Sequence, residues 1–229
     1  MQTLDRSATL AQIVTEHPAA ARVFQSHAMD FCCHGDVSVE EACRGAPLDP
    51  EVIVAELEEA LGDARERHGP EDDPRALSKV ALIARIVDRY HGYARRALPH
   101  IAPILAKVVS VHGPRDASLY ELQAIFRELS DALLPHLDEE EQVLFPAILA
   151  PRPDPGVVKR ELERMVGDHL VVGRQLARIR TLTQCYSTPE WGCTTYRVLM
   201  SELEALEADT LRHVHLENHV LAPLASRAA

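Results

Sequence analysis

Hydrophobic residues recur at steps of three and four over most of the chain, which is the spacing that amphipathic helices require. Turn-forming segments rich in Gly, Pro, Asp and Ser separate four long stretches of this kind. These stretches cover approximately residues 77–112, 118–149, 156–186 and 193–226. Strand-like alternation bounded by turns is absent from the sequence, so the pattern predicts an all-α fold. Four helices joined by short loops pack most simply as an up-down-up-down antiparallel bundle.

Shorter helical patterns precede the four long ones. They are expected around residues 7–15, 18–27, 38–44 and 50–61. The apolar periodicity then stops in a stretch of Gly, Pro and dense charge, GDARERHGPEDDPRAL, which is typical of a linker. The sequence therefore predicts a small helical cysteine-bearing domain at residues 1–62, a linker at 63–76 and a four-helix bundle at 77–229.

The pattern His-x-x-x-Glu occurs in both the second and the fourth long stretch. The two copies are His136–Glu140, in PHLDEEEQVLFP, and His213–Glu217, in RHVHLENHVLAP. Residues four apart lie one turn above each other on the same face of a helix. An imidazole and a carboxylate placed in this way can reach one metal ion or bridge two.

His91 and His169 lie on the first and third long stretches, so each predicted helix brings a histidine. All six of these polar residues fall within the apolar stripe of their helices. In the second helix, the stripe is expected to continue from Glu140 to Val143 and Ala147. A buried ionised carboxylate costs several kcal/mol unless it is paired or bound to a metal. Hydrogen-bonded core residues are the alternative, which suits one such histidine better than the whole set.

Four imidazoles and two carboxylates suit a dinuclear iron centre better than a single zinc ion. If Glu140 and Glu217 both bridge, each iron has two histidines and two carboxylate oxygens from the protein. Open positions then remain for water, an oxo bridge, O₂ or nitric oxide. Manganese and zinc stay open as alternatives. The chain contains no Glu-x-x-His, the motif that ferritin-like di-iron bundles use.

Other histidines and acidic residues are interpreted as lying outside this ligand set. Those on a more polar face or in solvated clusters are His215, His219, Asp138, Glu139 and Glu141. On an unbroken helix His112 would lie roughly 30 Å from His91. His112 and Asp168 are interpreted as surface residues, with a place beside the ligands or on an access path as the alternative.

Two adjacent cysteines, Cys32 and Cys33, occur in the segment DFCCHGD, and Cys43 follows in EEAC. Adjacent thiols seldom form a relaxed disulfide, because the small ring strains the peptide between them. They are candidates for electron exchange, for passing on iron or for transient metal binding. The alternative is a pair of small residues buried in a helical turn.

Composition excludes several classes of partner. The net charge of −11 argues against nucleic acid, which would need a basic surface. No apolar run approaches the roughly 20 residues that span a bilayer, and the first residues do not form a signal-peptide pattern. Five cysteines without CxxC spacing do not indicate a secreted disulfide framework. We therefore expect a cytoplasmic protein that binds neither nucleic acid nor membrane.

The order of motifs along the chain resembles one known family, the RIC proteins, named for repair of iron centres. The matching segments are DFCC, EEAC, RYHGYARRALP, KVVSVHG, HLDEEEQVLFP, DHLVVGRQLARIRTLT and HVHLENHVLAP. The resemblance implies a short cysteine-bearing domain followed by a hemerythrin-like di-iron bundle, active in nitrosative and oxidative stress. It also implies a homodimer. The family's iron ligands carry over onto His91, His136, Glu140, His169, His213 and Glu217.

Three positions depart from the family pattern. His34 follows the cysteine pair where glycine is usual, and it could add a ligand or change thiol reactivity. Asp168 replaces a glutamate before the third-helix histidine, and His219 stands where asparagine is usual. None of these changes removes a proposed iron ligand.

Four functions are considered, and the fourth, a metal-free scaffold, has little support because two carboxylates are expected to be buried. The first is a stress-response protein that supplies iron to damaged iron–sulfur proteins, with Cys32 and Cys33 assisting the transfer. The second is a di-iron nitric oxide reductase, and the third is a sensor or carrier that binds O₂ or NO reversibly. The resemblance favours repair, while the sequence leaves open whether the chain is an enzyme.

Overall fold

The computed structural model describes residues 7–44, 47–65 and 73–226. Regular structure in this part of the chain is helical, apart from one isolated bridge between Thr9 and Ser38. The fold is therefore all-α, as the hydrophobic pattern predicts. Among the described residues, none of the helices combines the length and the apolar character that crossing a membrane requires.

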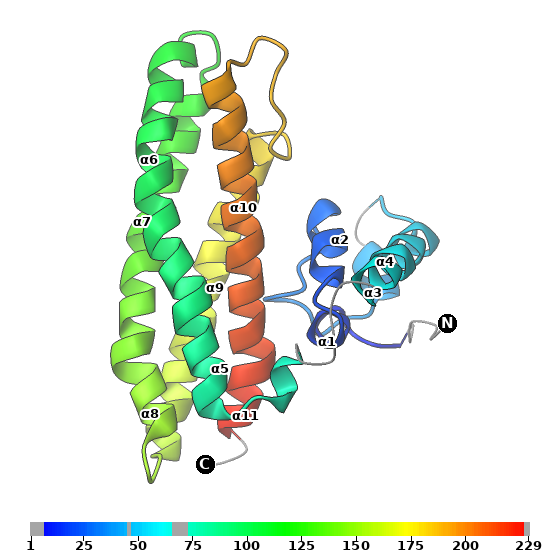
Figure 1. Cartoon of the computed structure of the whole chain (residues 1–229), viewed down its shortest axis with the longest axis vertical. Helices are drawn as coiled ribbons and strands as arrows, with labels where there is room; N and C mark the ends of the chain where they lie inside the picture. Colours follow the sequence, from blue (N-terminus) through cyan, green and yellow to red (C-terminus); the bar gives the residue numbers. More distant parts are fainter. Residues whose placement is uncertain (1–6, 45–46, 66–72, 227–229) are drawn as a thin grey trace.

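Four long helical arms stand side by side and alternate in direction, so the expected up-down-up-down bundle is confirmed (Figure 1). The first arm consists of α5 (Lys79–Arg85), η3 (Ile86–His91) and α6 (Gly92–His112). The second consists of α7 (Ser118–Glu139), η4 (Glu140–Leu144) and α8 (Phe145–Leu149). The third is α9 (Pro155–Leu182), and the fourth consists of α10 (Thr194–Leu216), η5 (Glu217–Leu221) and α11 (Ala222–Ser226).

The N-terminal segment forms a small group of helices beside α10 (Figure 1). Its helices are α1 (Leu10–Glu16), α2 (Ala20–Ser26), α3 (Val39–Arg44) and α4 (Pro50–Arg65). The last helix therefore extends beyond its expected end at residue 61. Of the expected linker 63–76, residues 66–72 lie outside the described part, and a short 3-10 helix, η2 (Pro74–Ala76), precedes the bundle.

The bundle has two apolar core clusters, one on each side of a polar layer. One cluster contains residues from Ala94 to Val109 of α6 and from Tyr196 to Leu206 of α10. The other contains Leu82 to Tyr90 of the first arm and Leu216 to Ala225 of the fourth. The buried histidines and glutamates fall between the two clusters along each arm. The helices are thus held by apolar packing above and below the polar layer, and this packing fixes where the polar side chains meet.

Three π-helical segments interrupt the arms, and they lie at His91, Glu140 and Glu217. A π-turn adds a residue to the turn and so shifts the buried face by one position, and such turns are frequent at functional sites. The second arm shows the effect, because Val143 is 44% exposed and Leu144 is fully buried. The expected continuation of the stripe to Val143 was therefore wrong.

Candidate metal centre

The six residues singled out in the sequence all lie buried in the polar layer of the bundle. They form two overlapping groups whose ligand atoms lie within 4.8 Å of one another. One group is His91, Glu140, His213 and Glu217, and the other is His136, Glu140, His169 and Glu217. Both glutamates belong to both groups, so the layer has the composition of two adjacent four-ligand sites that share their carboxylates.

In the first group, the Nε2 atoms of His91 and His213 lie 3.1 Å apart. The Oε2 atom of Glu140 lies 3.5 Å from His91 Nε2. The Oε2 atom of Glu217 lies 3.0 Å from His213 Nε2, one helical turn below it. Imidazoles from the first and fourth arms therefore meet one carboxylate from each of the second and fourth arms.

The second group repeats this arrangement with the other two histidines. The Nε2 atoms of His136 and His169 lie 3.1 Å apart. Glu140 Oε1 lies 3.3 Å from His136 Nε2, and Glu217 Oε2 lies 3.2 Å from His169 Nε2. Glu140 thus presents one oxygen to each histidine pair.

Outer partners hold three of the four imidazoles through their Nδ1 atoms. His91 Nδ1 lies 2.8 Å from Glu141 Oε1, and His169 Nδ1 lies 2.9 Å from Asn218 Oδ1. His136 Nδ1 lies 3.4 Å from Asp168 Oδ2. Each partner atom is an acceptor, so Nδ1 is the donor and Nε2 of the neutral ring carries a lone pair. Metal-binding histidines are typically oriented in this way.

These outer partners correct two sequence interpretations. Glu141 is not simply solvated, since its carboxylate accepts from His91 and also pairs with Arg95. Asp168 was interpreted as a surface residue, with a place beside the ligands as the alternative. Its side chain is partly exposed but contacts His136 of the layer, so the alternative is observed. Asn218 was missed, although its position directly after Glu217 was a signal that it would lie near the layer.

Burial and neighbouring charges shift the ionisation of the buried carboxylates and imidazoles of the layer in different directions. Burial, together with the charge of Glu217, raises the pKa of Glu140 well above its usual range. Burial also opposes ionisation of Glu217, but the imidazoles of His213 and His169 outweigh it and hold that pKa well below the usual range. Burial lowers the pKa of His136 to about 3, so this ring stays neutral.

No residue in the described part of the chain donates a hydrogen bond to the four carboxylate oxygens of Glu140 and Glu217, although all four are buried. A buried acceptor without a donor costs about 1–3 kcal/mol, and more when it is charged. Neutral imidazole lone pairs that converge with carboxylate oxygens form a donor set for cations. The residues therefore fit a metal centre, and imidazole with carboxylate suits iron.

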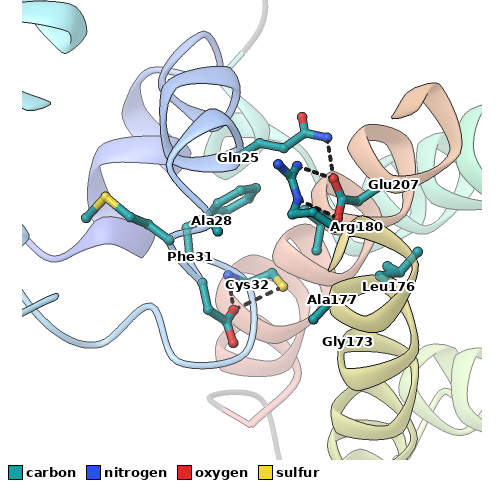
Figure 2. Close-up of a pocket in the computed structure, with 12 residues that line it drawn as sticks. Gln25, Ala28, Phe31, Cys32, Gly173, Leu176, Ala177, Arg180 and Glu207 are labelled. Atoms are coloured by element: carbon teal, nitrogen blue, oxygen red, sulfur yellow. Dashed lines mark hydrogen bonds and ion pairs between the residues drawn. The ribbon is translucent and has the colours of Figure 1, made fainter. Parts of the chain in front are cut away.

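The cysteine pair lies in the loop between α2 and α3, beside this layer. Cys32 is buried and Cys33 is partly exposed, and their sulfur atoms lie 3.6 Å apart as free thiols. Cys33 Sγ lies 3.8 Å from the carbonyl oxygen of His169. Cys32 also lines a cavity of about 110 Å³, and Figure 2 shows Gly173 and Ala177 of α9 on the neighbouring wall. The thiols thus adjoin a helix that carries a histidine of the layer.

His215 and His219 do not join the layer, but they do not lie on a solvated face either. The N-terminal helices cover this side of α10, and His215 is buried with Nε2 at 3.0 Å from Thr15 Oγ1. The side chains of His219 and Asn218 both donate to the carbonyl oxygen of Cys32, each at 2.9 Å. Periodicity along one helix could not reveal this contact, because a distant segment makes it.

His112 lies at the opposite end of the first arm, since α6 continues unbroken past Pro99 and Pro103. Its Nε2 atom lies 3.3 Å from Cys193 Sγ at the start of α10. Its ring packs against Trp191 and Tyr196. The expected separation from the layer is therefore observed, and the contact with Cys193 is new.

Comparison with protein families divides the chain in two. Residues 82–225 match the hemerythrin HHE cation binding domain, and residues 6–61 match a domain of unknown function, ScdA_N or DUF542. The first match covers the helices that form the polar layer. The hemerythrin domain and the buried histidine–glutamate groups together fit iron binding.

Curated relatives match over almost the whole chain. The iron-sulfur cluster repair protein ScdA of Staphylococcus haemolyticus is 34% identical over 219 residues, which is 93% of this chain and 95% of that protein. The iron-sulfur cluster repair protein YtfE of Yersinia pseudotuberculosis is 33% identical over 223 residues, 97% of this chain and 98% of that protein. Matches of this extent show that the chain belongs to the RIC family, the hemerythrin-domain proteins that include ScdA and YtfE.

Proposed function

We propose that the chain is a di-iron protein that repairs or supplies iron to iron–sulfur clusters damaged by nitric oxide or oxidative stress. The observation that carries this proposal is the pair of histidine groups that share two glutamates in one buried layer. The names of its relatives indicate the target, since they are called iron-sulfur cluster repair proteins.

Each proposed iron ion would take two histidines, one ion at His91 and His213 and the other at His136 and His169. Glu140 and Glu217 would bridge them. Two adjacent ferrous ions would supply electrons and open coordination positions for NO or O₂. The protein's own residues orient the imidazoles through Glu141, Asp168 and Asn218, and they exclude bulk water by burial.

The thiols of Cys32 and Cys33 are proposed to assist the transfer of iron out of the layer. Their support is position, because Cys33 adjoins His169 and Cys32 is tied to Asn218, which in turn holds His169. A pure gas carrier or sensor would need only the bundle. We propose a cytoplasmic location, where a reducing environment would keep the thiols free. We also propose a homodimer, which the family resemblance implies.

The test is anaerobic repair of a cluster-damaged iron–sulfur enzyme by the iron-loaded chain. We expect recovery of enzyme activity together with loss of iron from the chain. The variant with both Cys32→Ser and Cys33→Ser should still bind NO but deliver iron more slowly, and Cys43→Ser is the matched control. NO consumption without iron delivery would instead favour the reductase. Unchanged delivery by the double variant would remove the thiols from the mechanism.

A further inference from the structure

A second group of metal-type donors lies outside the bundle layer, in the loop between α2 and α3. Asp30 Oδ1 lies 3.3 Å from Cys32 Sγ, and the two sulfur atoms of Cys32 and Cys33 lie 3.6 Å apart. The three ligand atoms fall within 4.8 Å of one another. A carboxylate oxygen and two thiols therefore converge on one point of the loop.

Two of the three separations are close to those around a single tetrahedral ion. Two thiolates bound at about 2.3 Å with a tetrahedral angle are about 3.8 Å apart. A thiolate and a carboxylate oxygen bound at about 2.1 Å are about 3.6 Å apart in the same geometry. The observed distances of 3.6 Å and 3.3 Å differ from these by about 0.2–0.3 Å. Small side-chain rotations would be enough to admit the ion.

The loop orients the donors before any ion enters. Asp30 Oδ1 accepts the backbone N–H groups of Cys32 and Cys33, at 3.2 and 2.8 Å, which sets the carboxylate against the sulfur atoms. The second oxygen, Oδ2, lies 2.6 Å from His34 Nδ1. His34 thus fixes the carboxylate from the outside, as outer partners do at metal sites.

The site is reachable from solvent on one side and adjoins the bundle on the other. The side chains of Asp30 and His34 are 43% and 71% exposed. Cys33 contacts the carbonyl oxygen of His169, and the carbonyl oxygen of Cys32 is held by Asn218 and His219 from η5. An ion at this point would lie between bulk solvent and the histidine layer.

We propose that Asp30, Cys32 and Cys33 form a second metal site, which binds one divalent transition-metal ion such as Fe²⁺ or Zn²⁺ and is positioned by His34. Binding replaces the two thiol protons, which leave to solvent, by two metal–sulfur bonds and one metal–oxygen bond. The fourth position stays open, as it does at exchangeable metal sites. Metal binding at this site does not depend on the proposed function. A role of the site as the exit point for iron does rest on that function.

The test is an anaerobic titration of the iron-loaded full chain with Co²⁺. Thiolate ligands give a charge-transfer band in the near ultraviolet, which histidine and carboxylate ligands do not give. The difference spectrum therefore reports Co²⁺ bound to thiolate, and the cysteine variants show which thiols bind it. We expect the band to saturate at one equivalent while the iron content of the bundle stays constant. The single variants Cys32→Ser and Cys33→Ser should each abolish the band. The control variants Cys43→Ser and Cys193→Ser should keep it.

Substitutions of the exposed side chains of Asp30 and His34 supply a second test, because they change the Co²⁺ affinity without disturbing buried packing. His34→Gly should weaken Co²⁺ binding about 10- to 100-fold, the range seen when outer partners are changed, and Asp30→Asn, which removes a charged ligand, should weaken it at least as much. A missing band, or a band that survives in either cysteine variant, would overturn the proposal. If Asp30→Asn binds Co²⁺ as tightly as the unchanged chain, the carboxylate is not a ligand and the three-ligand site is overturned. Iron content, measured separately, shows whether the bundle assignment fails as well.

Discussion

The Nε2 atoms of His136 and His169 face each other at 3.1 Å from α7 and α9. Both rings donate outward through Nδ1, to Asp168 and Asn218, so two lone pairs point at each other inside the bundle. Two such lone pairs repel unless a cation lies between them and the carboxylates. The hydrogen bonds of this pair, and not only its residue types, therefore suit the layer to a metal ion.

Removing Glu140 tests the shared carboxylates. Glu140→Ala should lose most of the bound iron, because one substitution removes an oxygen from each proposed ion. The neighbouring Glu139→Ala is the matched control, since Glu139 is exposed and pairs with Arg164. Elemental analysis after anaerobic reconstitution measures the iron per chain. Two irons retained in Glu140→Ala would contradict the bridging assignment.

Asn218 connects the layer with the cysteine loop, because its Oδ1 accepts from His169 and its Nδ2 donates to the carbonyl oxygen of Cys32. Asn218→Ala should lower iron affinity about 10- to 100-fold, the effect typical of outer partners. Asn218→Asp keeps an acceptor for His169 and should retain most of the affinity. Competition with a chelator gives both values. Equal affinity in the alanine variant would show that His169 is oriented by packing alone.

The layer could be read from sequence because a buried stripe is a local property of a helix. His136, Glu140, His213 and Glu217 keep helical spacing, and each arm contributes its histidine to the same level of the bundle. The π-turns could not be read in this way. A regular period of 3.6 residues does not mark where a turn takes an extra residue, and that extra residue changes which side chains after Glu140 are buried.

Contacts between distant segments account for the remaining differences. His215 lies on a stripe with polar neighbours, and only the docking of α1 and the loop before α3 buries it against Thr15 and Phe31. Glu141 likewise follows three acidic residues, and its role beside His91 depends on an arm 50 residues away in sequence. Composition and periodicity describe one segment at a time, so they do not contain these pairings.

The ion pair of Arg180 and Glu207 lies at the contact between the bundle and the N-terminal helices. Gln25 of α2 donates to Glu207 at 2.9 Å, and the side chains of Arg180 and Glu207 are 12% and 3% exposed (Figure 2). Glu207→Ala leaves the guanidinium without its carboxylate, and breaking a buried pair in this way costs about 3–5 kcal/mol. Urea unfolding followed by helical circular dichroism should show this loss.

The control for this change is Glu204→Ala, on the same helix but exposed. It should alter the free energy of unfolding by less than about 0.5 kcal/mol. A similarly small effect for Glu207→Ala would mean that water solvates the guanidinium of Arg180 as favourably as the carboxylate of Glu207 pairs with it. The domain contact would then depend on the apolar residues around Phe24 and Val214 instead.

Cys193 should react as a thiolate near neutral pH. The hydrogen bond with His112, together with backbone N–H groups at the start of α10, lowers the pKa of Cys193 to about 7. The thiolate fraction, and with it the rate of alkylation by iodoacetamide, should rise as the pH increases through 7 and level off above it. Cys185, also exposed in the loop between α9 and α10, is the reference in the same mass spectra.

His112→Phe keeps a ring between Trp191 and Tyr196 but removes the hydrogen bond to Cys193. Without it the pKa of Cys193 should move back toward 9.0, the ordinary value of a thiol. The thiolate fraction at pH 7 then falls about 50-fold, while the higher basicity makes each thiolate about eightfold more nucleophilic. The net expectation is a five- to tenfold slower alkylation at pH 7, with the rate profile displaced to higher pH. An unchanged profile would show that the start of α10, and not His112, activates the thiol.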